Sequence, residues 1–224
     1  MSNVRPSKKT RSRGLRGRFV QLTSIATAGL GLASFPLLAQ EGTVEAGQEK
    51  LTGLACTGCH GMDGNAPASQ WPSLAGQHAT YTRRQLEAYQ EGERADQLME
   101  MPVEGLSGQD IRDIAAYYAA QSMNVKGADP ALVERGERIY RGGIPERDIA
   151  ACIACHGPAG KGNPLAGYPR VSHQHAAYLE KTLRDYRSGA RRSDAELNQM
   201  MRNVAEMLLD DEIRALASYM QGLN

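Results

Sequence analysis

The chain contains an internal repeat, and this repeat limits its possible folds more than any other feature. Three short segments each occur twice, in the same order, at offsets of 96, 97 and 102 positions. The paired segments are Cys56-Thr57-Gly58-Cys59-His60-Gly61 with Cys152-Ile153-Ala154-Cys155-His156-Gly157, Gln77-His78-Ala79-Thr80-Tyr81 with Gln174-His175-Ala176-Ala177-Tyr178, and Ile111-Arg112-Asp113-Ile114-Ala115 with Ile213-Arg214-Ala215-Leu216-Ala217. In a chain of 224 residues, this pattern predicts two homologous domains in tandem.

Both copies predict helices joined by long loops, and therefore an all-α fold. A closing helix is predicted from Ser107, with Asp110 three residues later as in a capping box. Apolar residues follow at i, i+3, i+4 and i+7 in both closing helices. They are Ile111, Ile114, Ala115 and Tyr118 in the first copy, and Ile213, Leu216, Ala217 and Met220 in the second.

Two further helices are expected in each copy. A middle helix carries Leu86 and Tyr89, and its counterpart carries Leu183 and Tyr186. Opening helices are expected over residues 46–54 and from the Asp129-Pro130 pair to about residue 141. At one glycine in each opening helix, the missing side chain would allow the closing helix to cross closely; incidental glycine is the alternative. These glycines are Gly47 and Gly136.

The domain boundaries follow from composition. The first 18 residues hold seven basic side chains and no acidic one, and a mostly apolar run continues to Ala39. Residues 1–39 therefore predict a signal peptide, with an uncleaved membrane anchor as the alternative. The short polar stretch from Ser122 to Ala128 suits a linker, which places the first domain at 40–124 and the second at 125–224.

Charge is distributed unevenly once residues 1–39 are set aside. Residues 40–124 hold 5 basic and 12 acidic residues, whereas residues 125–224 hold 14 basic and 13 acidic ones. This balance disfavours nucleic acid as a partner and favours a protein partner with a basic patch for the first half. The alternative is that the acidity only keeps an exported protein soluble.

All four cysteines belong to two Cys-x-x-Cys-His motifs, the pattern of c-type haem attachment. The thiols of each pair lie one helical turn apart and can bond the two vinyl groups of one haem, and the adjacent histidine can bind its iron. We therefore expect two covalently attached haems c. The expected attachment residues are Cys56, Cys59, Cys152 and Cys155, and the expected proximal ligands are His60 and His156.

Bulk composition and loops agree with a large prosthetic group in each domain. Aromatic residues make up only 5% of the chain, too few for conventional aromatic-rich cores in two small domains. Residues 61–77 and 157–174 are rich in Gly, Pro, Asn and Ser and show no periodicity. Long irregular loops in small domains need a reason, and wrapping a haem supplies one.

Three rival interpretations of the cysteines fit less well. A shared zinc site would bring together two pairs that 92 residues separate, far more than zinc ribbons use. A disulfide framework explains neither the histidine after each pair nor the duplication. A thioredoxin-like redox pair needs a βαβ context that the helical pattern does not provide.

A methionine in each copy is the expected sixth iron ligand. Met99 lies eight residues before Ser107, and Met201 lies eight residues before Leu209, its counterpart. Methionine ligation raises the reduction potential and suits electron transfer. Met101 and Met200 are neighbouring competitors, and flexible core filler is the alternative role for any methionine.

The remaining histidines and two prolines have weaker assignments. His78 and His175 are alternative axial ligands, but each opens a middle helix, and we favour a structural or haem-propionate contact for both. A backbone carbonyl at Pro72 or Pro169 would suit the second ring nitrogen of the proximal histidine; a turn-forming proline is the alternative. His173 has no counterpart in the first copy and is expected at the surface.

Taken together, these motifs resemble the diheme cytochrome c4 family over nearly all of residues 42–224. The second half adds similar segments: Gly162-Asn163, Leu165-Ala166-Gly167-Tyr168-Pro169 and Ser218-Tyr219-Met220-Gln221-Gly222-Leu223. The resemblance implies two cytochrome c-like domains with pseudo-twofold symmetry, haem propionates near their interface and His/Met ligation of both irons. The chain departs from the family at Met99-Glu100-Met101-Pro102 and in a shorter stretch over residues 91–98.

By this resemblance, we expect a periplasmic single-electron carrier, not an enzyme, that delivers electrons to a terminal oxidase or another respiratory acceptor. Its expected partners are redox proteins, such as a terminal oxidase, a reductase or a quinol-oxidising complex, with peripheral association at the outer face of the inner membrane. The alternative is the cytochrome subunit of an oxidoreductase complex, such as a flavocytochrome c sulfide dehydrogenase. The matched methionines argue against a diheme peroxidase.

Overall fold

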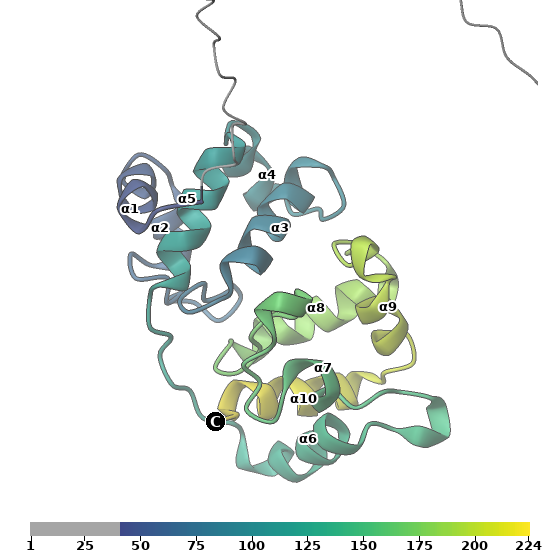
Figure 1. Cartoon of the computed structure of the whole chain (residues 1–224). Helices are drawn as coiled ribbons and strands as arrows, with labels where there is room; N and C mark the ends of the chain where they lie inside the picture. Colours follow the sequence, from purple (N-terminus) through teal and green to yellow (C-terminus); the bar gives the residue numbers. More distant parts are fainter. Residues whose placement is uncertain (1–40) are drawn as a thin grey trace, which may run out of the picture. The chain divides into compact units, whose positions relative to one another are not determined.

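The computed structural model describes residues 41–224, and the predicted leader, residues 1–39, lies outside them (Figure 1). The described chain is helical, with short 3-10 turns and isolated bridges but no strand within this range. The all-α prediction is confirmed. Ten α-helices are described: α1 Val44–Thr52, α2 Cys56–His60, α3 Ala79–Gln90, α4 Gln97–Glu104, α5 Gly108–Ala119, α6 Pro130–Gly142, α7 Ile153–His156, α8 Ala176–Ser188, α9 Met200–Ala205 and α10 Asp210–Gly222.

The helices form the same arrangement twice, as the internal repeat predicts. In the first copy, α5 packs on α1 and α3; in the second, α10 packs on α6 and α8. Residues 122–128 lie between the copies and contain no helix, in keeping with a linker. None of the helices within residues 41–224 has the length and hydropathy of a membrane span.

The closing helices cross the opening helices at the two predicted glycines. A Cβ atom on Gly47 would lie 2.1 Å from the carbonyl oxygen of Asp113 in α5. A Cβ atom on Gly136 would lie 2.3 Å from the carbonyl oxygen of Ala215 in α10. Neither position has room for a methyl group, so the prediction of a close crossing is confirmed in both domains.

Each domain has its own apolar core on the inner side of its closing helix. In α5, Ile111, Ile114, Ala115 and Tyr118 are all buried, as the periodicity predicts. The helix also begins as expected, because the Ser107 side chain accepts a bond from the backbone N–H of Asp110 while the Asp110 carboxylate accepts one from the backbone N–H of Ser107. In the second domain, Ile213, Leu216, Ala217 and Met220 form the equivalent buried stripe.

One sequence expectation is wrong: His173 is not at the surface. Its side chain is 5% exposed, and its backbone has a left-handed φ of 60°. The backbone N–H of His173 donates to the carbonyl oxygen of Met220 at 3.2 Å, and its Nδ1 lies 3.3 Å from the carbonyl oxygen of Gln221. The end of α10 therefore covers a residue that the sequence places in a polar loop.

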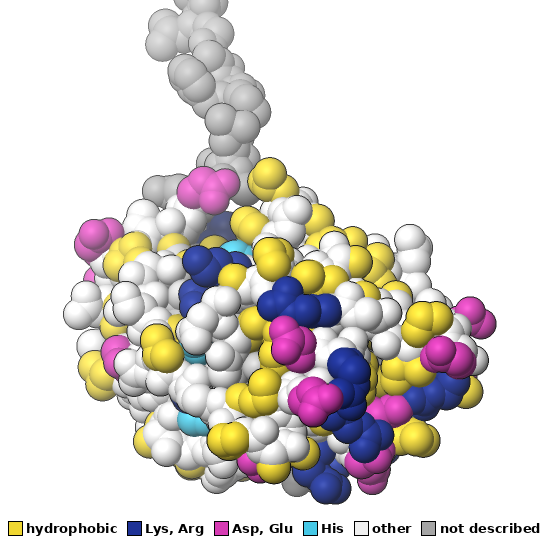
Figure 2. All heavy atoms as spheres, turned by 90° about the horizontal axis from the view of Figure 1, so that it is seen from below, with side chains coloured by type: hydrophobic (Ala, Val, Ile, Leu, Met, Phe, Trp, Pro, Cys, Tyr) yellow, Lys and Arg dark blue, Asp and Glu magenta, His cyan; other side chains and the backbone are white. Residues whose placement is uncertain are grey.

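The surface charges of the second domain alternate in sign. Arg135 pairs with Asp211 at 2.6 Å, and Arg141 pairs with Glu137 at 2.8 Å. On the face seen in Figure 2, basic side chains lie beside acidic ones and do not form a patch of one sign. This mixture agrees with the near balance of 14 basic and 13 acidic residues in positions 125–224.

Candidate haem sites

The two Cys-x-x-Cys-His motifs form short helices that face a common cavity. Within α2 and α7, the motif histidines are almost fully buried: His60 is 6% exposed and His156 is 7% exposed. None of the four motif cysteines is in a disulfide, and all four line the cavity beside the histidines. Among residues 41–224, no three His, Cys, Asp or Glu side chains lie together as a metal-binding group.

Each motif histidine is oriented by a proline carbonyl. Nδ1 of His60 lies 2.9 Å from the Pro72 carbonyl oxygen, and Nδ1 of His156 lies 2.9 Å from that of Pro169. A carbonyl oxygen can only accept, so each Nδ1 carries the proton and donates it. The predicted contacts are confirmed, and the tautomer leaves the Nε2 lone pair of both rings available to a metal.

Burial keeps these imidazoles in the form that can bind iron. It lowers the pKa of His60, partly offset by the bond to Pro72, and the positive charge of Arg94 lowers this pKa further. Burial likewise lowers the pKa of His156, again partly offset by its carbonyl partner. Both rings are therefore neutral at pH 7, as a histidine ligand must be.

The structure separates the competing methionines of the first domain. Met99 packs against the first core and lines the cavity, whereas Met101 is 82% exposed and lies outside its lining. In the second domain, Met201 and Met200 both line the cavity, and the Met200 sulfur lies 3.9 Å from the Cys155 sulfur. This geometry favours Met99 over Met101, and the assignment of Met99 and Met201 as ligands stays a prediction.

His78 and His175 lie outside the cavity lining and make structural contacts between the domains. Nε2 of His78 donates to the carbonyl oxygen of Lys161 at 2.7 Å, and Nε2 of His175 donates to that of Ala66 at 3.0 Å. Each histidine therefore binds a loop of the other domain. The favoured structural role is confirmed, and this placement argues against bis-histidine ligation.

The residue before each of these histidines also crosses the interface, which sequence reasoning did not foresee. Gln174 donates to the Ser73 carbonyl oxygen at 2.8 Å and accepts from the Ser73 backbone N–H at 2.9 Å. Gln77 makes the same two contacts with the backbone of Arg170, at 2.9 and 3.0 Å. The repeated Gln-His pair was the signal of this reciprocal interface.

The cavity suits an apolar group that carries a few polar oxygens. Its volume is about 480 Å³, and apolar side chains from both domains line most of it. Within residues 41–224, the buried polar side-chain atoms without a hydrogen-bond partner belong to Thr82, Arg84, Gln85 and Tyr118, and all four residues line this cavity. Unpartnered buried donors are costly, so their collection beside the two motifs fits a porphyrin with carboxylate side chains.

Comparison with known proteins gives the same interpretation. The cytochrome c family model matches residues 44–121 and 133–224. Cytochrome c4 from Stutzerimonas stutzeri is 44% identical over 192 residues, covering 82% of this chain and 90% of that protein. A protein named thiosulfate dehydrogenase electron acceptor, from Stutzerimonas stutzeri strain A1501, is 36% identical and covers 74% of this chain and 77% of its own length.

A solved structure has the same fold. The crystal structure of reduced recombinant cytochrome c4 from Pseudomonas stutzeri superposes with a TM-score of 0.78 at 44% identity, covering 82% of this chain and all of that one. The relatives match across both domains, and the chain accordingly carries a covalently bound haem c on each domain and acts as an electron carrier. The duplicated motifs, the buried histidines and these matches together show that the chain belongs to the diheme cytochrome c4 family.

Proposed function

We propose that this protein is a periplasmic single-electron carrier in which a histidine and a methionine bind each iron, and which delivers electrons to a terminal oxidase or another respiratory acceptor. Cys56 and Cys59 attach the first haem, and Cys152 and Cys155 attach the second. The proposed iron ligands are His60 with Met99 and His156 with Met201. The proposed leader, residues 1–39, directs export.

One observation carries the ligand assignment. In each domain, a buried histidine with its Nδ1–H bonded to a proline carbonyl and a methionine from a separate helix line the same cavity. The methionines come from α4 in the first domain and from α9 in the second. Corresponding helices of the two copies thus supply corresponding ligands.

The proposed ligands suit electron transfer better than substrate chemistry. Each haem supplies a one-electron iron couple when bound. The carbonyl bond at Nδ1 holds the imidazole in place and strengthens the donation from Nε2. A methionine on the other side raises the potential and leaves no open coordination position. We therefore propose that the chain is not itself an enzyme.

Replacing each proposed methionine tests the ligand assignment. Met201→Ala and Met99→Ala should each convert one ferric haem to a high-spin or water-ligated form and leave the other low-spin, as read from the visible and electron paramagnetic resonance spectra. Met200→Ala and Met101→Ala are the matched controls and should keep two low-spin haems. An unchanged spectrum in Met201→Ala, with a change in Met200→Ala, would assign the second-domain ligand to Met200.

A second candidate function follows from the name of one relative. One relative is named a thiosulfate dehydrogenase electron acceptor, so the second candidate donor for this chain is a dedicated oxidoreductase. In this case the chain would be the electron-accepting partner or subunit of such an enzyme, a class that includes the flavocytochrome c sulfide dehydrogenases considered from the sequence. Rapid reduction of the purified cytochrome by a thiosulfate or sulfide dehydrogenase, with slow reduction by a quinol-oxidising complex, would favour this candidate.

A further inference from the structure

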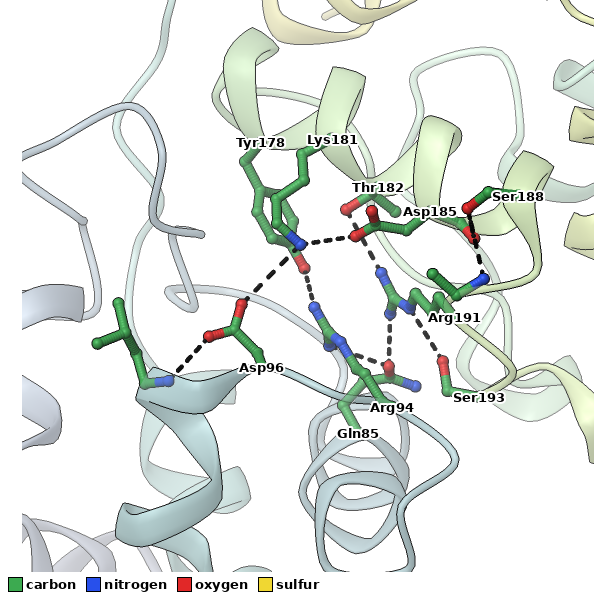
Figure 3. Close-up of polar contacts among 12 residues, drawn as sticks. Gln85, Arg94, Asp96, Tyr178, Lys181, Thr182, Asp185, Ser188, Arg191 and Ser193 are labelled. Atoms are coloured by element: carbon green, nitrogen blue, oxygen red, sulfur yellow. Dashed lines mark hydrogen bonds and ion pairs between the residues drawn. The ribbon is translucent and has the colours of Figure 1, made fainter.

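Two arginines at equivalent positions of the two copies each donate a hydrogen bond to the other domain. Arg94 of the first copy donates to the Tyr178 hydroxyl of the second at 2.8 Å, and Arg191 of the second donates to the Tyr81 hydroxyl of the first at 2.8 Å. Their backbones also form an isolated antiparallel bridge. Figure 3 shows the two guanidinium groups next to each other, with Tyr178 on one side and Gln85 between them.

Gln85 joins the two arginines. Its Oε1 accepts a hydrogen bond from Arg94 at 3.1 Å and another, shorter one from Arg191. Each guanidinium also lies over a tyrosine of its own domain: Arg94 over Tyr89 at 4.5 Å and Arg191 over Tyr186 at 4.7 Å. Both side chains are therefore held in fixed positions at the interface.

The arginines have no anionic partner among the described residues. Arg191 is only 2% exposed, yet neither it nor Arg94 forms an ion pair with an Asp or Glu of residues 41–224. By contrast, Arg202, close in sequence, bonds the buried carboxylate of Asp194 at 2.8 Å. Arg191 is buried and Arg94 is half-buried, and ring faces and neutral oxygens offset only part of the cost of enclosing their charges, so an anion is the expected complement.

The two arginines lower the pKa of a neighbouring side chain, Tyr178. Burial raises the pKa of Tyr178, but the positive charges of Arg94 and Arg191 and the hydrogen bond from Arg94 outweigh burial and lower this pKa to about 7. A buried phenol would ordinarily titrate above its free value. The surroundings of Tyr178 thus favour negative charge.

One buried donor of the cluster, on Gln85, is without a partner. Gln85 is 6% exposed, and its Nε2 has no hydrogen-bond partner. Gln85, Arg94 and Tyr178 line the same cavity as the two haem-attachment motifs, whereas Arg191 lies behind this lining, bonded to Gln85 and Tyr81. Guanidinium and amide N–H groups together form a strong binding site for carboxylates.

We propose that Arg94 and Gln85, with the charge of Arg191 behind them, form one shared carboxylate-binding site that holds propionate groups of both haems and couples their reduction potentials. This inference rests on the two attached haems. The arginines are joined through Gln85 beside a cavity that both attachment motifs line, so their charges lie close to both haem sites. A nearby positive charge favours the reduced, less positive state of a redox group, so both arginines should raise both potentials.

The test is a spectroscopic redox titration of the matured diheme protein carrying Arg191→Gln. We expect both midpoint potentials to fall, with the reduced-to-oxidised ratio of each haem changing about tenfold at a fixed ambient potential, equivalent to about 59 mV for a one-electron couple. Both potentials should also depend more strongly on pH near neutrality, because an unpaired propionate regains a higher pKa. Arg94→Gln should act in the same direction.

Two further variants separate charge from packing. Arg191→Lys keeps the positive charge and should retain most of the potential that Arg191→Gln loses. Arg192→Gln is the matched control, since Arg192 is an exposed neighbour that pairs with Glu93 at 3.6 Å, and it should leave both potentials unchanged. If Arg191→Gln does not mature, Arg191→Lys and Arg94→Gln decide the question.

The outcomes are distinct. Unchanged potentials in both glutamine variants, a fall at only one haem, or an equal fall in Arg191→Lys and Arg191→Gln would each overturn the shared site. The proposed function fails separately, through loss of a covalent haem in the mass spectrum or of the methionine ligand in the optical spectrum. The shared site can therefore be wrong while the electron carrier remains.

Discussion

At the residue scale, short-range patterns were predictable and contacts between domains were not. The roles of the motif cysteines and histidines follow from five adjacent residues, and a carbonyl partner twelve or thirteen residues on could be inferred for His60 and His156. Arg94 and Arg191 gave no signal, because the tyrosine hydroxyls that hold them at the interface belong to the other domain. His173 was misplaced for a different reason: the end of α10, in the same domain but distant in sequence, buries it.

Adding a single Cβ atom to the glycine of an opening helix should destabilise the protein. Gly47→Ala should destabilise the haem-loaded protein by about 1–3 kcal/mol, because its Cβ would lie 2.1 Å from the Asp113 carbonyl oxygen and the helices would have to separate. Gly53→Ala, at the end of the same helix, is the control; its Cβ would meet its nearest atom at 3.8 Å. Chemical denaturation measures the difference. Equal stability of the two variants would contradict the close crossing.

At the element scale, the sequence predicted the long helices and missed the short ones that carry methionines. The closing helices α5 and α10 have clear apolar stripes and were predicted closely. The helix α4 has Pro102 inside it, which breaks the usual pattern, and α9 has only six residues and follows two left-handed residues, Asn198 and Gln199. Such short helices depend on packing around the cavity more than on local propensity.

This difference explains why the methionine positions could be inferred before their helices. Met99 and Met201 were found by alignment of the two copies, a signal that needs no secondary structure. Alignment could not decide between Met99 and Met101, however, because both lie close to the expected position. The turn of α4 decides which side chain faces inward: Met99 lines the cavity and Met101 is exposed.

At the scale of the whole molecule, the two domains bind each other through equivalent residues. Gln77 and Gln174 each satisfy the backbone N–H and carbonyl of one residue in the opposite domain. Duplication was evident from the sequence, but the mutual contact was not, since periodicity within a domain does not define its outer partner. The interface therefore had to be read from the structure.

Removing one of these glutamines should weaken the interface. Gln174→Ala leaves the buried N–H and carbonyl of Ser73 without partners, and each unsatisfied group costs about 1–3 kcal/mol. We expect a lower thermal midpoint and, as the domains uncouple, two unfolding transitions in calorimetry. Gln48→Ala, at an exposed site, is the control and should unfold as the parent does. Identical melting of the Gln174 variant would show that this contact does not join the domains.

The central claim is that two haems are attached covalently, one in each domain. Mass spectrometry of the matured, denatured protein tests this most directly, combined with peptide mapping of the two Cys-x-x-Cys-His segments. We predict the mass of the polypeptide plus two haems, with one haem on the peptide containing Cys56 and Cys59 and the other on the peptide containing Cys152 and Cys155. A mass with one haem or none, or cystine bridges in these peptides, would contradict the account.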